Sequence, residues 1–137
     1  MNIKRLLIAT LAVAVFSFIF GMLTCGWLFN WVYQLEPTNV WKSMENFPFA
    51  LYIVSLLLVE LIFVYVYALI NKGIPGQNKV AKGALYGLIV WAAGLIPGMV
   101  CTYMFMTVAT TVVIYWTIQG LVMLPLKGII AASIYNE

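Results

Sequence analysis

The chain has 137 residues, of which 65% are hydrophobic and only 8% are charged, and its mean hydropathy is +1.05. Because a water-soluble domain needs a largely polar surface, this composition excludes one and indicates an integral membrane protein. Histidine and aspartate are absent, which excludes histidine general bases, haem ligation by histidine, the usual zinc sites and aspartyl dyads within the chain.

Four apolar runs are each long enough to cross a bilayer as a helix, which takes about 20 residues for a hydrocarbon core of about 30 Å. The runs are continuously apolar, whereas the strands of a transmembrane barrel alternate between apolar and polar residues. We therefore predict an all-α fold, a bundle of four transmembrane helices forming a single integral membrane domain over residues 1–137. The predicted spans are 6–29, 48–70, 84–104 and 109–130.

The first span follows Lys4 and Arg5, a pattern that also describes a secretory signal peptide. Its apolar run is longer than the usual signal core of about 7–15 residues, and no clean cleavage site with small residues follows it. A lipoprotein signal at Cys25 fails for a similar reason, since the residue before it is not small. We expect the first span to remain in the protein as a membrane helix.

The connection between the first two spans predicts an interfacial segment. It begins with a turn at residues 36–39 and continues with Trp41, Met44 and Phe47, which form a short amphipathic pattern. Trp27 and Tyr33 come just before it, and aromatic rings of this kind favour the level of the lipid headgroups.

Glu60 lies near the middle of the second span, where a charged side chain costs roughly 2.5–3.5 kcal/mol, so it should face the bundle interior or a water-filled cavity. Residues three or four apart share a helix face, which aligns Glu60 with Tyr52 toward one end and with Tyr67 and Asn71 toward the other. We predict a site for a ligand or a proton at Glu60, with a hydrogen-bonded path through these three side chains. The alternative, a neutral glutamic acid that only hydrogen-bonds another helix, stays open.

Other spans offer partners for Glu60. Gln119 and Trp116 on the fourth span are included in the predicted binding site. Lys127 is the other charge near the hydrocarbon zone, but counting from the outer ends of the two spans at 1.5 Å per residue places it roughly 10 Å deeper than Glu60. We expect Lys127 to extend toward the headgroups rather than to pair with Glu60.

Small residues predict where the helices meet, because membrane helices associate through close backbone approach. The glycines assigned to helix packing are Gly21, Gly83, Gly87, Gly94, Gly98 and Gly120. Homodimerisation through one of these faces stays open as an alternative to packing within the bundle. Pro97 and Pro125 lie inside the third and fourth spans and predict kinks. Cys25 and Cys101 fall at similar predicted depth, so a disulfide and two free, packed thiols are both open.

Lysine and arginine predict the orientation. Six of them lie at the predicted inner ends of the spans: Lys4, Arg5, Lys72, Lys79, Lys82 and Lys127. By the positive-inside rule these ends and both termini are cytoplasmic. The net charge of +3 serves this orientation, and no basic patch suited to nucleic acid is present.

The glycines and aromatic residues from Lys82 to Tyr135, including Trp91 and the Pro97-Gly98 pair, resemble those of small four-helix bacterial inner-membrane proteins of uncharacterised function. That resemblance implies a stand-alone multi-pass protein of the cytoplasmic membrane and no activity to transfer. In size and in its lone membrane glutamate, Glu60, the chain also resembles small multidrug resistance exporters, although their glutamate belongs to the first span. This second resemblance implies a dimer with an essential glutamate.

We therefore expect a non-enzymatic membrane protein without a cofactor or metal, because no nucleophile with a neighbouring base is evident. It would bind or translocate protons or a small lipophilic or cationic ligand at Glu60. The alternative is a structural or accessory subunit that docks through its glycine faces. The expected partners are the lipid bilayer and either further copies of the chain or other membrane subunits.

Overall fold

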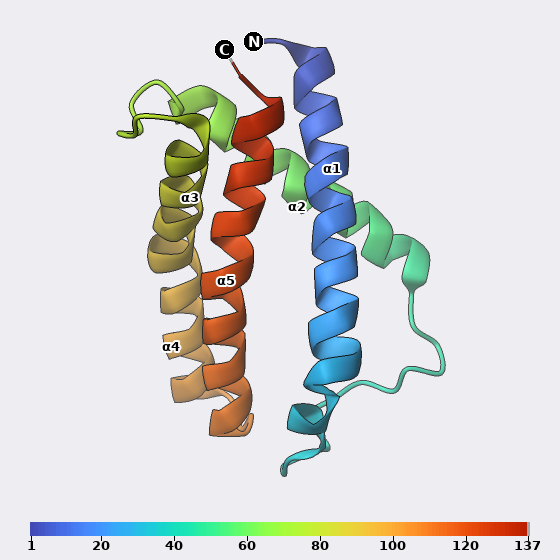
Figure 1. Ribbon diagram of the computed structural model, residues 1–137. Helices are drawn as coiled ribbons and strands as arrows, with labels where there is room; N and C mark the ends of the chain where they lie inside the picture. The colour runs from blue at the N-terminus through green and yellow to red at the C-terminus, as the bar shows by residue number, and fades with distance from the viewer. Residues whose placement is uncertain (137) are drawn as a thin grey trace.

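The computed structural model describes residues 1–136, which form a helical bundle without strands (Figure 1). The helices are α1 (Ile3–Leu23), α2 (Phe49–Ile70), α3 (Lys79–Val90), α4 (Ile96–Phe105) and α5 (Thr110–Ile134). A π-helical turn extends α1 to Leu28, and another at Trp91–Leu95 joins α3 to α4. Four helical stretches are thereby long and apolar enough to cross a membrane. The predicted all-α, multi-pass architecture is confirmed at this level.

The first and third stretches begin earlier than the predicted spans, at Ile3 and Lys79. Capping side chains, rather than the start of the apolar run, determine these ends. The Asn2 side chain accepts a hydrogen bond from the Arg5 backbone N–H at 3.1 Å. The Asn78 side chain accepts one from the Ala81 N–H at 2.8 Å. Asparagine at this position satisfies a backbone donor that the helix itself leaves unpaired.

The two prolines are accommodated differently. Pro97 lies in the first turn of α4, directly after the π-helical turn. Because proline has no N–H and its ring clashes with the carbonyl four residues earlier, the wide turn relieves the backbone at this point. α5 continues through Pro125 as one helix from Thr110 to Ile134.

α3 and α5 form the most extensive helix pair, and their backbones touch at glycines. A Cβ atom added at Gly83 would overlap the backbone of Gly128, and one at Gly87 would overlap the backbone at Leu124. The Leu95 side chain occupies the corresponding space at Gly120. These contacts hold the third and fourth membrane-crossing stretches side by side (Figure 1).

Three other glycines take no part in this packing. No neighbouring atom lies within 4 Å of a Cβ placed at Gly21, Gly94 or Gly98. These three glycines therefore make no close packing contact within the described bundle, and packing against a second copy stays open for them. Small residues on a membrane helix permit close approach, but only the tertiary arrangement decides whether a second helix is there.

α2 crosses the bundle obliquely, and its first half diverges from the other helices (Figure 1). Its buried side chains all lie in the second half: Glu60, Phe63, Val64 and Tyr67. Their spacing of three and four residues places them on one helix face. The first half of α2 consequently contributes little to the core. The connection 35–48 runs along the bundle to the start of α2.

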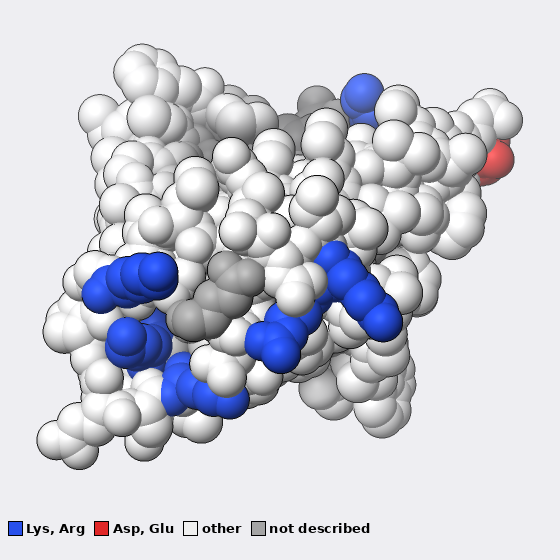
Figure 2. All heavy atoms as spheres, turned by 90° about the horizontal axis from the view of Figure 1, so that it is seen from above, with Lys and Arg blue, Asp and Glu red and all other residues white. Residues whose placement is uncertain are grey.

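Both termini lie at the same end of the bundle, which we call the terminal end (Figure 1). An Arg5 guanidinium N–H donates a hydrogen bond to the backbone carbonyl of Asn136 there. The hydrophobic core lies toward this end, since it includes Leu6 and Ala9 of α1 and Ala132 near the end of α5. Figure 2 looks onto the terminal end and shows lysine and arginine side chains gathered on it.

Candidate functional site

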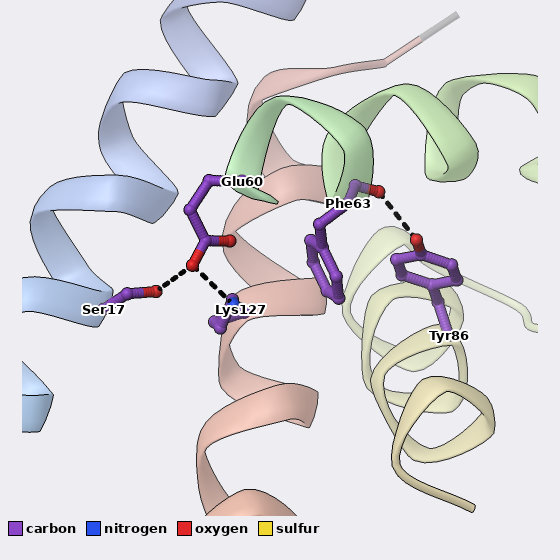
Figure 3. Close-up of polar contacts among 5 residues, drawn as sticks. All are labelled: Ser17, Glu60, Phe63, Tyr86 and Lys127. Carbon is purple, nitrogen blue, oxygen red and sulfur yellow. Dashed lines mark hydrogen bonds and ion pairs between the residues drawn. The ribbon is translucent and has the colours of Figure 1, made fainter. Parts of the chain in front are cut away.

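Glu60 is 2% exposed and lies between α1, α2 and α5, with its carboxyl group directed into the bundle (Figure 3). One carboxyl oxygen, Oε1, accepts hydrogen bonds from two other helices. The Ser17 hydroxyl of α1 donates at 2.8 Å, and the Lys127 ammonium of α5 donates at 2.7 Å. A carboxylate thus joins three membrane-crossing helices through a single oxygen atom.

The second carboxyl oxygen, Oε2, is buried and has no hydrogen-bond partner among residues 1–136. In Figure 3 it points away from Ser17, toward the side of Phe63. Buried polar atoms in native proteins are nearly always hydrogen-bonded, and an unsatisfied one calls for a physical explanation. Oε2 is thus a buried acceptor to which no group of residues 1–136 donates.

Lys127 is 4% exposed, and its ammonium lies 4.8 Å from the centre of the Phe63 ring as well as 2.7 Å from Glu60. The prediction that Lys127 extends to the headgroups without pairing is therefore wrong. Equal depth had been assumed for the outer ends of the second and fourth spans, but the tilted α2 begins partway along the bundle (Figure 1). Glu60, the twelfth residue of α2, therefore lies at the same depth in the bundle as the part of α5 that follows Pro125.

Aromatic rings of α2 and α3 pack beside the Glu60–Lys127 pair. The Phe63 and Tyr86 rings lie 4.8 Å apart, and the Tyr86 and Tyr67 rings 5.3 Å apart. The Tyr86 hydroxyl donates to the Phe63 backbone carbonyl at 2.6 Å (Figure 3). This bond anchors α2 to α3 and holds the Phe63 ring where it faces the Lys127 ammonium, an arrangement that favours a cation.

The other residues predicted beside Glu60 on α2 do not contact its carboxyl group. Asn71 donates to the Ala68 carbonyl at 2.7 Å, and Tyr52 packs its ring against Phe18 near the start of α2. Within residues 1–136 no hydrogen bond joins Glu60 to Tyr52, Tyr67 or Asn71. The continuous path predicted along the helix is absent from these residues, because Tyr52 packs against other aromatic rings and Asn71 binds its own helix backbone.

Gln119 and Trp116 belong to a separate polar cluster in the half of the bundle away from the termini. Gln119 donates to the Thr24 hydroxyl at 2.8 Å and to the Cys25 sulfur at 3.1 Å. The Trp116 indole donates to the Tyr33 hydroxyl at 2.8 Å. This cluster joins the π-helical end of α1 to α5. It takes no part in the Glu60 pair.

The two cysteines are both free thiols, and Cys101 is exposed. Cys25 is half-buried beside Gln119 and the hydroxyl of Tyr115. Of the two alternatives the sequence left open, the structure supports unpaired thiols.

Ser17 is the partner of Glu60 that sequence reasoning missed. It stands in the row of small residues on the first span, where serine indicates helix packing as readily as hydrogen bonding. Its spacing from Thr10 and Ala14 places it on the buried face of α1. Nothing in that spacing indicated which residue of the face would meet the carboxylate.

Comparison with protein families, with curated proteins and with solved structures finds no match to this chain. Its function must therefore be argued from its own residues.

The residues at the centre limit the chemistry. Among residues 1–136 no group of three or more histidine, cysteine or acidic side chains is placed to hold a metal ion. Among the described residues, one oxygen of Glu60 accepts from two donors and the other from none, and Glu60 is the carboxylate that pairs with Lys127. A proton or a cation that bound the carboxyl group would compete directly with the lysine.

Proposed function

We propose that this chain is a small, non-enzymatic membrane protein in which the Glu60–Lys127 pair takes up and releases a proton or a small lipophilic cation. The vacant, buried Oε2 of Glu60 is the observation that carries the proposal. Ionisable groups within membrane helices are rare and commonly mark the paths of ions or substrates. Following the positive-inside rule, the terminal end faces the cytoplasm, and the resemblance described above suggests a bacterial inner membrane.

The mechanism follows from the competition at the carboxyl group. When a proton binds Glu60, its attraction for Lys127 falls, and the flexible lysine side chain can extend toward the headgroups at the terminal end. When the proton leaves, the ion pair re-forms. Movement of α2 would accompany this exchange at low cost, because its first half buries no side chain. A lipophilic cation would replace the lysine at the same carboxylate.

Neutralising the carboxylate tests this function. In liposomes that contain the protein, an imposed membrane potential should drive proton flux, and Glu60→Gln should reduce that flux to the level of protein-free liposomes. Binding of tetraphenylphosphonium, a lipophilic cation, should be lost in parallel. Glu45→Gln is the matched control, because Glu45 is an exposed carboxylate in the connection before α2 and should leave both readouts unchanged. Wild-type flux and cation binding in a correctly assembled Glu60→Gln protein would rule the proposal out.

A second candidate function, as an accessory subunit, is supported by the unoccupied glycines. Gly94 and Gly98 are four residues apart and share a helix face, and a Cβ added at either would meet no atom of residues 1–136 within 4 Å. A pair of glycines at this spacing is typical of a face that receives another membrane helix. The occupant would be a helix of a second copy or of another membrane protein, and Glu60 would then serve only to hold the bundle together.

Gly98→Leu distinguishes the accessory role, because a large side chain on the open face should prevent docking without disturbing the fold. We expect the partner or second copy that co-purifies from native membranes to be lost. Leu126→Ala, a change at an exposed residue of α5, should leave co-purification intact. A wild-type protein that purifies alone, without cross-linking, would contradict the subunit role.

A further inference from the structure

A cavity of about 210 Å³ opens at the terminal end, where the end of α2, the start of α3 and the end of α5 meet. Its lining is mostly polar and includes Tyr67 and Asn71 on one side. Gln77, Asn78, Lys79 and Lys82 line the other side. Among the described residues that line it there is no carboxylate. The cavity is separate from the Glu60 carboxyl group and from the cluster around Gln119.

The lining favours an anion. Lys79 and Lys82 lie in the first turn of α3, where the helix dipole also attracts negative charge. Among residues 1–136 the Lys82 ammonium donates one hydrogen bond, to the backbone carbonyl of Asn71 at 3.4 Å, so it keeps further donors for a ligand. Neither lysine forms an ion pair with a carboxylate of residues 1–136. Two cations thus border a polar cavity in which residues 1–136 provide no carboxylate.

The surroundings of the cavity indicate where the anion comes from. Leu69 and Ile70 precede Asn71 on α2, Val80 follows Lys79 on α3, and all three are exposed apolar side chains. Such residues at the end of a membrane-crossing helix face acyl chains, so the cavity lies where the apolar surface of the helices gives way to headgroups. The further basic residues Lys4, Arg5 and Lys72 share this end of the molecule (Figure 2).

We propose that this cavity binds the phosphate of an anionic phospholipid headgroup, with its acyl chains lying along the exposed apolar residues of α2 and α3. The phosphate would accept hydrogen bonds from the Lys79 and Lys82 ammonium groups and from the side-chain amide of Gln77 or Asn78. Basic pockets between membrane helices recognise anionic headgroups by this chemistry. The site would fasten the α2–α3 connection to one leaflet, whichever function Glu60 serves.

Lipid titration of the full-length protein in detergent, followed by native mass spectrometry, tests this site. Phosphatidylglycerol should bind the wild type more tightly than phosphatidylcholine, and raised salt should weaken it. Each lysine at the membrane surface contributes roughly a fivefold change in affinity, so Lys79→Gln with Lys82→Gln should weaken binding by about tenfold or more. Replacing both lysines by arginine should restore most of it, because the charge remains.

Matched controls locate the effect. Lys4→Gln removes a cation from the same end but outside the cavity, and Lys42→Gln removes one from the connection before α2, so both should retain wild-type affinity.

If the double glutamine variant does not fold, Lys79→Gln alone is measured, since Lys79 is exposed. Undiminished phosphatidylglycerol binding in the folded glutamine variants, or an equal loss in Lys4→Gln, would overturn the proposal. So would inorganic phosphate or glycerol 3-phosphate that binds the cavity as tightly as the lipid, because the ligand would then be a soluble anion.

Discussion

Replacing Lys127 by methionine should destabilise the protein by about 3–5 kcal/mol, since breaking a buried ion pair leaves the other charge without compensation. Glu60 would keep only the Ser17 hydroxyl as a donor, in an interior where its carboxyl group is 2% exposed. Methionine has a similar length and packs well beside Phe63, so the loss would reflect charge rather than a cavity. The free energy of unfolding in mixed micelles of mild detergent and dodecyl sulfate measures it.

The double variant Glu60→Gln with Lys127→Met gives this prediction its control. Once both charges are absent, no buried ion remains, so the double variant should be much more stable than Lys127→Met alone. Lys42→Met, in the exposed connection before α2, should change stability by less than about 0.5 kcal/mol. Additive losses in the double variant would mean that the two side chains are not coupled, contrary to the 2.7 Å contact.

Gly87→Ala should have the second large effect, a loss of about 3 kcal/mol or more with separation of α3 from α5. The added methyl group would overlap backbone atoms of Leu124 and the neighbouring Pro125, which cannot turn aside as a flexible side chain does. Overpacking of a close contact typically costs about 1–3 kcal/mol, and the rigidity of two facing backbones places this position at the upper end. Unfolding in the same micelles measures the loss.

The same substitution on the open glycine face provides the comparison. Gly98→Ala meets no atom within 4 Å and replaces glycine by a better helix former, so it should leave the monomer as stable as the wild type or slightly more so. Equal losses at Gly87 and Gly98 would show that general sensitivity of the helices, and not the contact with α5, decides the outcome.

The substitutions at Lys127 and Gly87 act on two sets of contacts that are physically connected. Contact between the backbones of α3 and α5 brings the Tyr86 ring to Phe63, and the Phe63 ring in turn lies beside the Lys127 ammonium. A change at Gly87 should therefore disturb the Glu60–Lys127 pair from a distance. In contrast, the loss of Lys127 removes the charge directly and leaves the glycine contacts in place.

The position of Glu60 shows how far the sequence leads toward a site. A carboxylate amid apolar residues had to face the interior, and the structure places it there at 2% exposure. The sequence did not predict its partners correctly. Counting residues along untilted helices placed Lys127 several residues deeper than Glu60. Likewise, Gln119 and Trp116 are polar residues of α5 on another level of the bundle, and their chemical type alone did not reveal this.

Length and composition by themselves determined that four helices are long and apolar enough to cross a membrane. A backbone in lipid must satisfy its hydrogen bonds locally, and a helix does so within one segment. Tertiary structure alone decided which helices touch and at what level. The tilt of α2, the backbone contacts at Gly83 and Gly87 and the open face at Gly94 and Gly98 depend on how surfaces from distant segments fit together. That fit brought Ser17 and Lys127 to the same oxygen of Glu60 and left the other one vacant.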